Sequence, residues 1–242
     1  STDGSYWGGS GWVGSEAWVV ASGTASWQLA LGSAQLVSGV TYSVSSRAVD
    51  SAGNSQSPVA SGSFLYDSGL PTSAIGAPAQ VGPQTWPGAV LGTASDGLTG
   101  VQRVDVAVVR WLGGQISYWD GSAWQDGFVQ NWIAATGTTT WRLDLPLGQL
   151  ANGASHTVTS RATDVAGNVQ SPTTSKSFTY DDVVPAVPTL VGIATDTGTA
   201  GDLVTNDRTL VFSGTAEATV TVELSLDGVV AATTTCGAGG TW

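Results

Sequence analysis

The sequence predicts an all-β chain built from tandem antiparallel β-sandwiches, and three observations lead to this fold class. Gly, Ser, Thr, Ala and Val dominate and there are eleven Trp in 242 residues, a mixture that suits pleated strands joined by tight turns. Turn signals recur about every 8 to 12 residues between short alternating segments. The run SRAVDSAGNSQSP at 46–58 returns as SRATDVAGNVQSP at 160–172. The chain therefore contains a repeat of the size of one small domain.

Charge and composition exclude several functional classes. Seven basic residues stand against eighteen acidic ones, a net charge of -11, whereas nucleic-acid binding needs clusters of Lys and Arg. No apolar run approaches the length of about 18 residues that a membrane span needs. Cys236 is the only cysteine, so each domain must be held by its core. The acidic excess serves solubility, or it binds cations where several Asp converge.

The first predicted domain, 1–67, is the C-terminal part of a repeat. It matches 118–181, with YWGGSGW at 6–12 answering YWDGSAW at 118–124. Matching residues of the two copies differ in number by 112 up to this hairpin and by 114 after it, so the second copy carries a two-residue insertion there. We expect the missing front half, the counterpart of 68–117, to lie before the first residue or to come from a neighbouring chain, because half a sandwich leaves an open core.

The second predicted domain, 68–181, is a complete repeat. Its strands are expected at 88–94, 101–111, 115–119, 123–125, 132–135, 139–145, 156–163 and 175–180. The period of two places His156, Val158, Ser160 and Ala162 on one inward face. Asp164 follows, and we expect it to accept backbone N–H groups in a turn closed by a left-handed Gly167 or Asn168.

The third predicted domain, 182–242, is the N-terminal part of a different module. Pro185 and Pro188 mark the boundary, since proline removes backbone donors and stiffens the chain. Strands are expected at 209–213 and 219–226, followed by a turn at Asp227-Gly228.

Several motifs carry a resemblance to known repeats. With GTASDGLTGVQRVDVAV at 92–108, a strand around Trp141 and SRATDVAGN at 160–168, the second copy resembles the bacterial Ig-like and fibronectin-III-like repeats of giant surface and secreted proteins. The DTG-x-x-GD-x-x-T-x-D run at 196–207 and FSGTAE at 212–217 are similar to extender modules of repeats-in-toxin adhesins. The resemblance implies a structural or adhesive segment of a long extracellular or cell-surface bacterial protein, a stalk or fibre whose partners are neighbouring repeats or identical protomers.

The resemblance also implies calcium at a domain junction. Carried over residue by residue, the metal ligands would be Asp181, Asp182, Asp196, Asp202 and Asp207. Calcium takes about six to eight oxygen ligands, so converging carboxylates suit it. The alternative is that these Asp are solvated turn residues. At the first junction Asp67 is followed by Ser68-Gly69, and we expect a poorer calcium site there.

The tryptophans leave more than one interpretation open. Trp18, Trp132, Trp27 and Trp141 lie within strand patterns, and we expect them in the core. The aromatic hairpins contain Trp7, Trp12, Trp119 and Trp124. These four either pack within the chain, form an interface to another protomer, or bind a surface glycan. A carbohydrate- or receptor-binding module is therefore one alternative function, and an accessory array of a secreted enzyme is another.

Catalysis within the chain is not expected. The only His, His156, and the only Cys, Cys236, fall in different modules, and neither is repeated in the other copies. No nucleophile, base and orienting group can be assembled from them. His156 matches Tyr42 of the first copy, a position that resembles the tyrosine corner of Ig-like folds, where a hydroxyl bonds back to the main chain.

Overall fold

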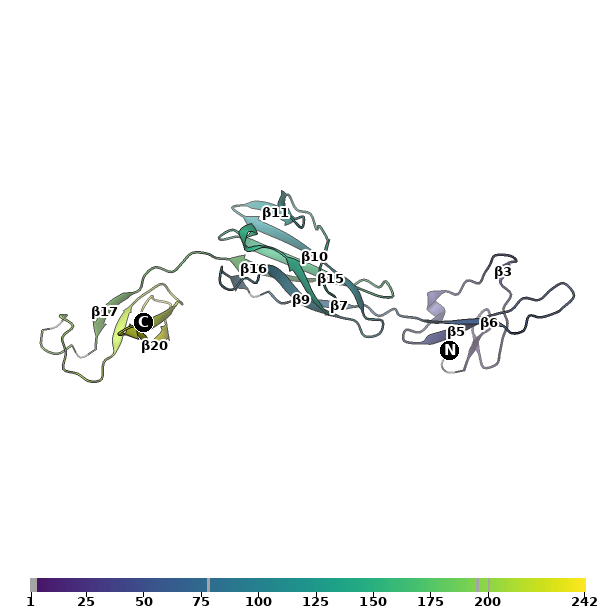
Figure 1. The fold of residues 1–242 in the computed structure, drawn as a ribbon, viewed down its shortest axis with the longest axis horizontal. Coiled ribbons are helices and arrows are strands. Elements are labelled where there is room, and N and C mark those ends of the chain that lie inside the picture. The colour runs from purple at the N-terminus through teal and green to yellow at the C-terminus, as the bar shows by residue number, and fades with distance from the viewer. Residues whose placement is uncertain (1–3, 78, 195, 200) are drawn as a thin grey trace. The chain divides into compact units, whose positions relative to one another are not determined.

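The computed structural model describes residues 4–77, 79–194, 196–199 and 201–242. The predicted all-β class is confirmed: in the described residues the regular elements are strands and two short 3-10 turns, η1 (Ser33–Gln35) and η2 (Leu147–Gln149). The chain divides into two compact units, Ser1–Asp181 and Asp182–Trp242 (Figure 1). Over the described residues, no helix has the length and apolar character needed to cross a membrane.

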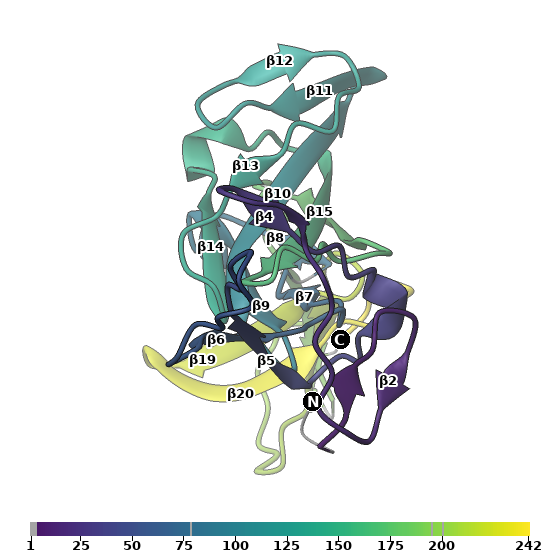
Figure 2. The ribbon, with the colours of Figure 1, turned by 90° about the vertical axis from the view of Figure 1, so that its right-hand side faces the viewer.

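Residues 68–181, the predicted complete repeat, form a sandwich of two sheets. Its strands are β7 (Thr72–Ile75), β8 (Gln80–Val81), β9 (Ala89–Ser95), β10 (Val101–Leu112), β11 (Gln115–Trp119), β12 (Trp124–Asp126), β13 (Ile133–Ala134), β14 (Thr140–Asp144), β15 (Ser155–Asp164) and β16 (Thr174–Tyr180). The larger sheet has the order β12-β11-β10-β15-β16-β8, with β13 also on β10, and the smaller has the order β14-β9-β7. Pairing is antiparallel except between β16 and β8, which run parallel. Figure 2 shows the β11–β12 hairpin at the end of β10, where β11 folds back and pairs with it.

Alternation along β10 and β15 builds the core between these sheets. Val104, Val106 and Val108 are at most 1 % exposed and pack with residues of β9 and β14. Burying one such side chain stabilises the fold by about 1.5–3 kcal/mol. On β15 the four positions predicted to face inward, from His156 to Ala162, are all fully buried.

A glycine in β9 makes room for a core tryptophan. Trp141 of β14 lies directly opposite Gly92, and its Nε1 donates a hydrogen bond to the carbonyl of Thr93 at 3.0 Å. A Cβ at Gly92 would collide with the Trp141 ring and with the carbonyl oxygen of Ala74. A larger residue at position 92 would therefore require the Trp141 ring or the β7 backbone to move.

The first repeat shows the same hairpins with an uncovered apolar face. Its strands are β1 (Tyr6–Trp7), β2 (Trp12–Val13), β3 (Ser22–Gly23), β4 (Trp27–Gln28), β5 (Thr41–Ser46) and β6 (Ala60–Leu65). Trp27 is 53 % exposed, whereas its counterpart Trp141 is 2 % exposed. The core prediction is wrong for Trp27, because residues 4–67 contain no strands matching β7, β9 and β10.

Two other tryptophans predicted to be buried lie on an outer face. Trp18 is 38 % exposed and Trp132 is half-buried. The guanidinium of Arg47 lies 4.1 Å from the Trp18 ring centre, and that of Arg161 lies 4.2 Å from the ring centre of Trp132. The core prediction is wrong for both, because each ring packs beneath an arginine as a cation–π pair.

The second unit contains β17 (Thr189–Ile193), β18 (Phe212–Thr215), β19 (Thr221–Leu226) and β20 (Val229–Thr235). The strand expected at 209–213 starts later, at Phe212. The turn at Asp227-Gly228 forms as predicted, with φ of 51° and 80°. The Trp242 ring lies against Gly214 so closely that a Cβ there would collide with it, which repeats the arrangement of Trp141 and Gly92.

Candidate metal centre

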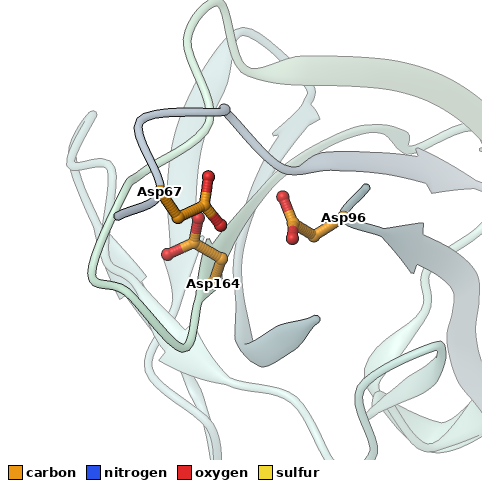
Figure 3. Close-up of side chains that lie close together, drawn as sticks. All are labelled: Asp67, Asp96 and Asp164. Carbon is orange, nitrogen blue, oxygen red and sulfur yellow. The ribbon is translucent and has the colours of Figure 1, made fainter. Parts of the chain in front are cut away.

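Three carboxylates meet where the first repeat ends and the second begins. Asp67 follows β6, Asp96 follows β9, and Asp164 is the last residue of β15. One carboxylate oxygen from each lies within 4.8 Å of the other two, and Figure 3 shows the three side chains gathered together. Among the described residues this is the one group of three His, Cys, Asp or Glu side chains that is so close.

Asp164 is held in the turn that the sequence predicts. Its Oδ1 accepts the backbone N–H of Asn168 at 2.8 Å, and its Oδ2 accepts the Asn168 side-chain amide at 2.8 Å. Gly167 has a φ of 93°, as expected for the left-handed position. The same Asn168 amide donates to the backbone carbonyl of Asp67 at 3.1 Å. The turn therefore contacts the end of the first repeat directly.

Asp96 is oriented by the loop that follows it. Its Oδ2 accepts backbone N–H groups from Leu98 at 2.9 Å, Thr99 at 2.8 Å and Gly100 at 3.0 Å. These bonds lower the pKa of the Asp96 carboxyl below its usual value, and the bond from Leu98 has the largest effect. The reason is that they favour the ionised form. The carboxylate is therefore charged at neutral pH.

Asp67 links the two repeats through both of its oxygens. Oδ1 accepts the backbone N–H of Gly69 at 2.8 Å, and Oδ2 accepts the hydroxyl of Thr99 at 2.7 Å. Asp67 is only 7 % exposed. The chain folds Asp67 inward against the loops of the next repeat, an arrangement that the Ser68-Gly69 sequence after it does not indicate.

The electrostatics of the group favour a cation. Asp67 and Asp164 are buried and Asp96 is half-buried, while the ion pairs among the described residues involve other carboxylates. Buried like charges are costly without a counter-charge. The donors are all carboxylates, with no imidazole or thiolate, which fits a hard cation such as Ca²⁺ better than zinc or copper.

The sequence predicts Asp164 to be a turn residue because it lies between two strands, and its repeat partner Asp50 shows the same turn. Asp50 occupies the same position in the first repeat and accepts the same bonds, from Asn54 N–H at 2.8 Å and the Asn54 amide at 2.7 Å. Asp50 is exposed and belongs to no such group. The turn motif alone therefore does not reveal the cluster, which also depends on Asp67 and Asp96.

The aspartates that the resemblance implies as ligands lie elsewhere. Asp196 accepts the N–H of Gly201 at 2.7 Å, Asp202 that of Val204 at 2.9 Å, and Asp207 that of Thr209 at 2.9 Å. Each shapes its own loop, and the structure does not gather these three into one group. Asp181 and Asp182 are exposed and belong to different units. Calcium binding by this set stays a prediction.

The aromatic hairpins are packed against their own repeats. Trp119 is 2 % exposed, and the half-buried Trp124 donates from Nε1 to the carbonyl of Gln149 at 2.8 Å. Trp7 and Trp12 are also half-buried, and their ring centres lie 5.6 Å apart. Of the three interpretations of these tryptophans, the structure favours packing within the chain.

His156 lies in the core of the complete repeat. It is fully buried, stacked on Phe178 at 4.7 Å and close to Trp124 at 5.6 Å. Burial and the neighbouring charge of Arg110 lower its pKa to about 4. Tyr42 likewise lies between two aromatic rings in the first repeat, stacked on both. The histidine therefore replaces a packing aromatic and has no access to a substrate.

No family model matches the chain, and no curated protein matches it. Among solved structures it is similar to a tetra-tandem repeat in the extending region of a large adhesion protein (22 % identity, 84 % of this chain, 47 % of that one, TM-score 0.30). It is also similar to a Ca²⁺-stabilized adhesin that helps an Antarctic bacterium bind ice (21 % identity, 84 % of this chain, 47 % of that one, TM-score 0.27). A third similar structure is a 1.5-MDa bacterial ice-binding adhesin (21 % identity, 85 % of this chain, 62 % of that one, TM-score 0.28). The chain spans about half the length of the first two. Similarity at this level concerns the fold alone.

Proposed function

We propose that the chain is a structural segment of a long bacterial extracellular protein, a stalk or fibre in which β-sandwich repeats follow one another and calcium stiffens a junction. The observation that supports this function is the convergence of Asp67, at the end of one repeat, with Asp96 and Asp164 from loops of the next. A site shared between successive repeats restrains how they move against each other, which is a mechanical role and needs no catalysis.

The residues around the junction already restrain it without a metal. Asp67 is tied to one loop through Thr99 and to another through Asn168. A bound Ca²⁺ would supply the positive charge that the three carboxylates lack. With that charge present, separating the repeats would expose an ion and its ligands. The proposed effect of calcium is therefore a stiffer and more stable junction.

The test compares melting of the full chain in Ca²⁺ and in EDTA. If Ca²⁺ binds the folded chain, a concentration of 100 times its dissociation constant raises the stability by about 2.7 kcal/mol. Small-angle scattering should show a narrower range of interdomain distances in Ca²⁺ than in EDTA. Equal melting temperatures and equal scattering in the two buffers would overturn the proposal.

Asp164→Asn and Asp50→Asn form a matched pair for this test. The two residues occupy equivalent turns, but only Asp164 belongs to the carboxylate group. Asn at either position retains one oxygen for the backbone N–H of the turn and loses the acceptor for the side-chain amide, so the two variants lose the same turn bond. We expect Asp164→Asn to remove the stabilisation by Ca²⁺ and Asp50→Asn to retain it. If Ca²⁺ still stabilised both variants, any calcium would bind outside the three carboxylates. The predicted positions Asp181 and Asp202 can then be substituted in the same assay.

A further inference from the structure

A groove lies on the outward face of the larger sheet of the complete repeat. Its volume is about 210 Å³, and it is lined by Ala107, Val109 and Trp111 of β10, Thr157 and Thr159 of β15, and Phe128 and Gln130 of the loop between β12 and β13. This face is opposite to the core, because the alternate residues of β10 are the valines that pack inward. The groove is thus separate from the carboxylate group and from the buried aromatic hairpin.

The loop that walls the groove differs between the two repeats. It contains the two-residue insertion that follows Trp124 in the second copy. Phe128 in this loop is 69 % exposed, and Trp111 beside the groove is 47 % exposed. Such large apolar side chains contribute little to the core when they remain in water, and loops on a rigid sheet are common places for binding. The insertion therefore points to a role in recognition.

We propose that this groove binds one ring of an uncharged saccharide. The rings of Trp111 and Phe128 offer apolar faces for the C–H side of a sugar, and the Gln130 amide offers donors and an acceptor for its hydroxyls. The hydroxyls of Thr157 and Thr159 already pair with those of Ser177 and Ser175 at 3.0 Å, and each retains capacity for one further hydrogen bond to the sugar. None of the seven lining side chains is charged, and the chain carries a net charge of -11. This charge distribution disfavours anionic sugars and provides no carboxylate for a cationic ligand.

The surroundings of the groove disfavour a peptide as its occupant. An extended peptide commonly binds by adding a strand to a sheet edge. The floor strands have no such edge here, since β10 pairs with β15 on one side and with β11 and β13 on the other, and β15 also pairs with β16. The volume is below the roughly 300–1,000 Å³ of pockets that enclose drug-sized ligands. The groove therefore fits a single ring of a longer glycan.

The binding test uses the full chain and four neutral oligosaccharides: maltotetraose, cellotetraose, mannotetraose and chitotetraose. Chemical-shift titration should detect at least one of them, with a dissociation constant of about 1 mM, which corresponds to about -4 kcal/mol. A sialylated tetrasaccharide should bind more weakly, and a mixed library of short peptides should not displace the sugar. No shift with any neutral sugar, or displacement by peptides, would overturn the proposal.

Three variants locate the site. Trp111→Ala and Phe128→Ala should each weaken binding at least tenfold, while Trp27→Ala should leave it unchanged, because Trp27 is comparably exposed but lies in the first repeat. Thr159→Val keeps the shape of the side chain and removes the hydroxyl together with its hydrogen bond to Ser175. Ser175→Ala removes the same bond but keeps the Thr159 hydroxyl, so it is the control for this polar contact. Unchanged binding in Trp111→Ala and Phe128→Ala would overturn the assignment of the groove.

Discussion

At the scale of single residues, His156 and Tyr42 show one position filled in two chemical ways. Both rings pack between two aromatic neighbours. The Tyr42 hydroxyl accepts the backbone N–H of Val37 at 2.8 Å, whereas neither ring nitrogen of His156 has a well-formed hydrogen bond. Buried polar atoms without partners are costly. The complete repeat thus holds a buried polar ring without hydrogen bonds, whereas the polar group at the matching position of the first repeat is paired.

Stability of the complete repeat should depend on pH through His156. Its pKa is about 4 in the folded state and 6.5 when unperturbed, so between these values the unfolded chain binds more protons and stability falls as the pH falls. Across this pH range the free energy of unfolding should fall by about 3 kcal/mol. Hydrogen exchange of β15 amides at pH 7 and pH 4 measures it.

His156→Tyr provides the control for this pH effect, since Tyr stands at the matching position of the first repeat. The variant should lose most of the decrease in protection between pH 7 and pH 4, whereas any contribution from the carboxylates would remain in both proteins. An identical decrease in the wild type and in His156→Tyr would show that the histidine is not responsible.

At the scale of elements, a tryptophan packed on a glycine recurs in both units. Trp141 covers Gly92 in the complete repeat, and Trp242 covers Gly214 in the second unit. Gly214 and Trp242 exchange backbone hydrogen bonds at 3.0 Å, so β18 pairs with the segment that carries the tryptophan. The module that looked unrelated by sequence therefore uses the same local device to close its strands.

Gly92→Ala should destabilise the complete repeat. The added Cβ would meet the Trp141 ring on one side and the Ala74 carbonyl on the other, so either the ring or the strand must move. The expected loss is about 3 kcal/mol, at the upper end of the usual cost of overpacking. Gly62→Ala is the matched control, because Gly62 also lies in a strand and a Cβ there meets nothing. Equal melting temperatures for the two variants would contradict this account.

Strand patterns were predictable from sequence, and the carboxylate group was not. The alternation of Val104, Val106 and Val108 fixes which face of β10 is buried, because burial in a sandwich follows the period of two. Asp67, Asp96 and Asp164 come from three distant parts of the chain, and only the arrangement of the strands brings them together. The positions of Trp18 and Trp132 outside the core were also missed, since a strand pattern does not show which of its rings an arginine covers.

At the scale of the whole molecule, the two repeats differ in what covers the same apolar face. Phe64 is 39 % exposed and Val44 is 48 % exposed, whereas their counterparts Phe178 and Val158 are at most 1 % exposed. In the complete repeat that face packs against strands of residues 68–117. The first repeat therefore presents a surface shaped to receive strands of this kind.

Joining a second copy of residues 68–117 directly ahead of Tyr6 should complete the first repeat. This junction reproduces the natural one, because Tyr6 matches Tyr118. Covering Trp27, Phe64 and Val44 should add roughly 1.5–3 kcal/mol for each side chain, and amides of β5 and β6 should exchange far more slowly. A graft in which Val104, Val106 and Val108 are replaced by Ser serves as the control, since it keeps the length and loses the apolar face. If the amides of β5 and β6 exchanged equally slowly in both grafts, or were not slowed in either, the exposed face would not bind these strands.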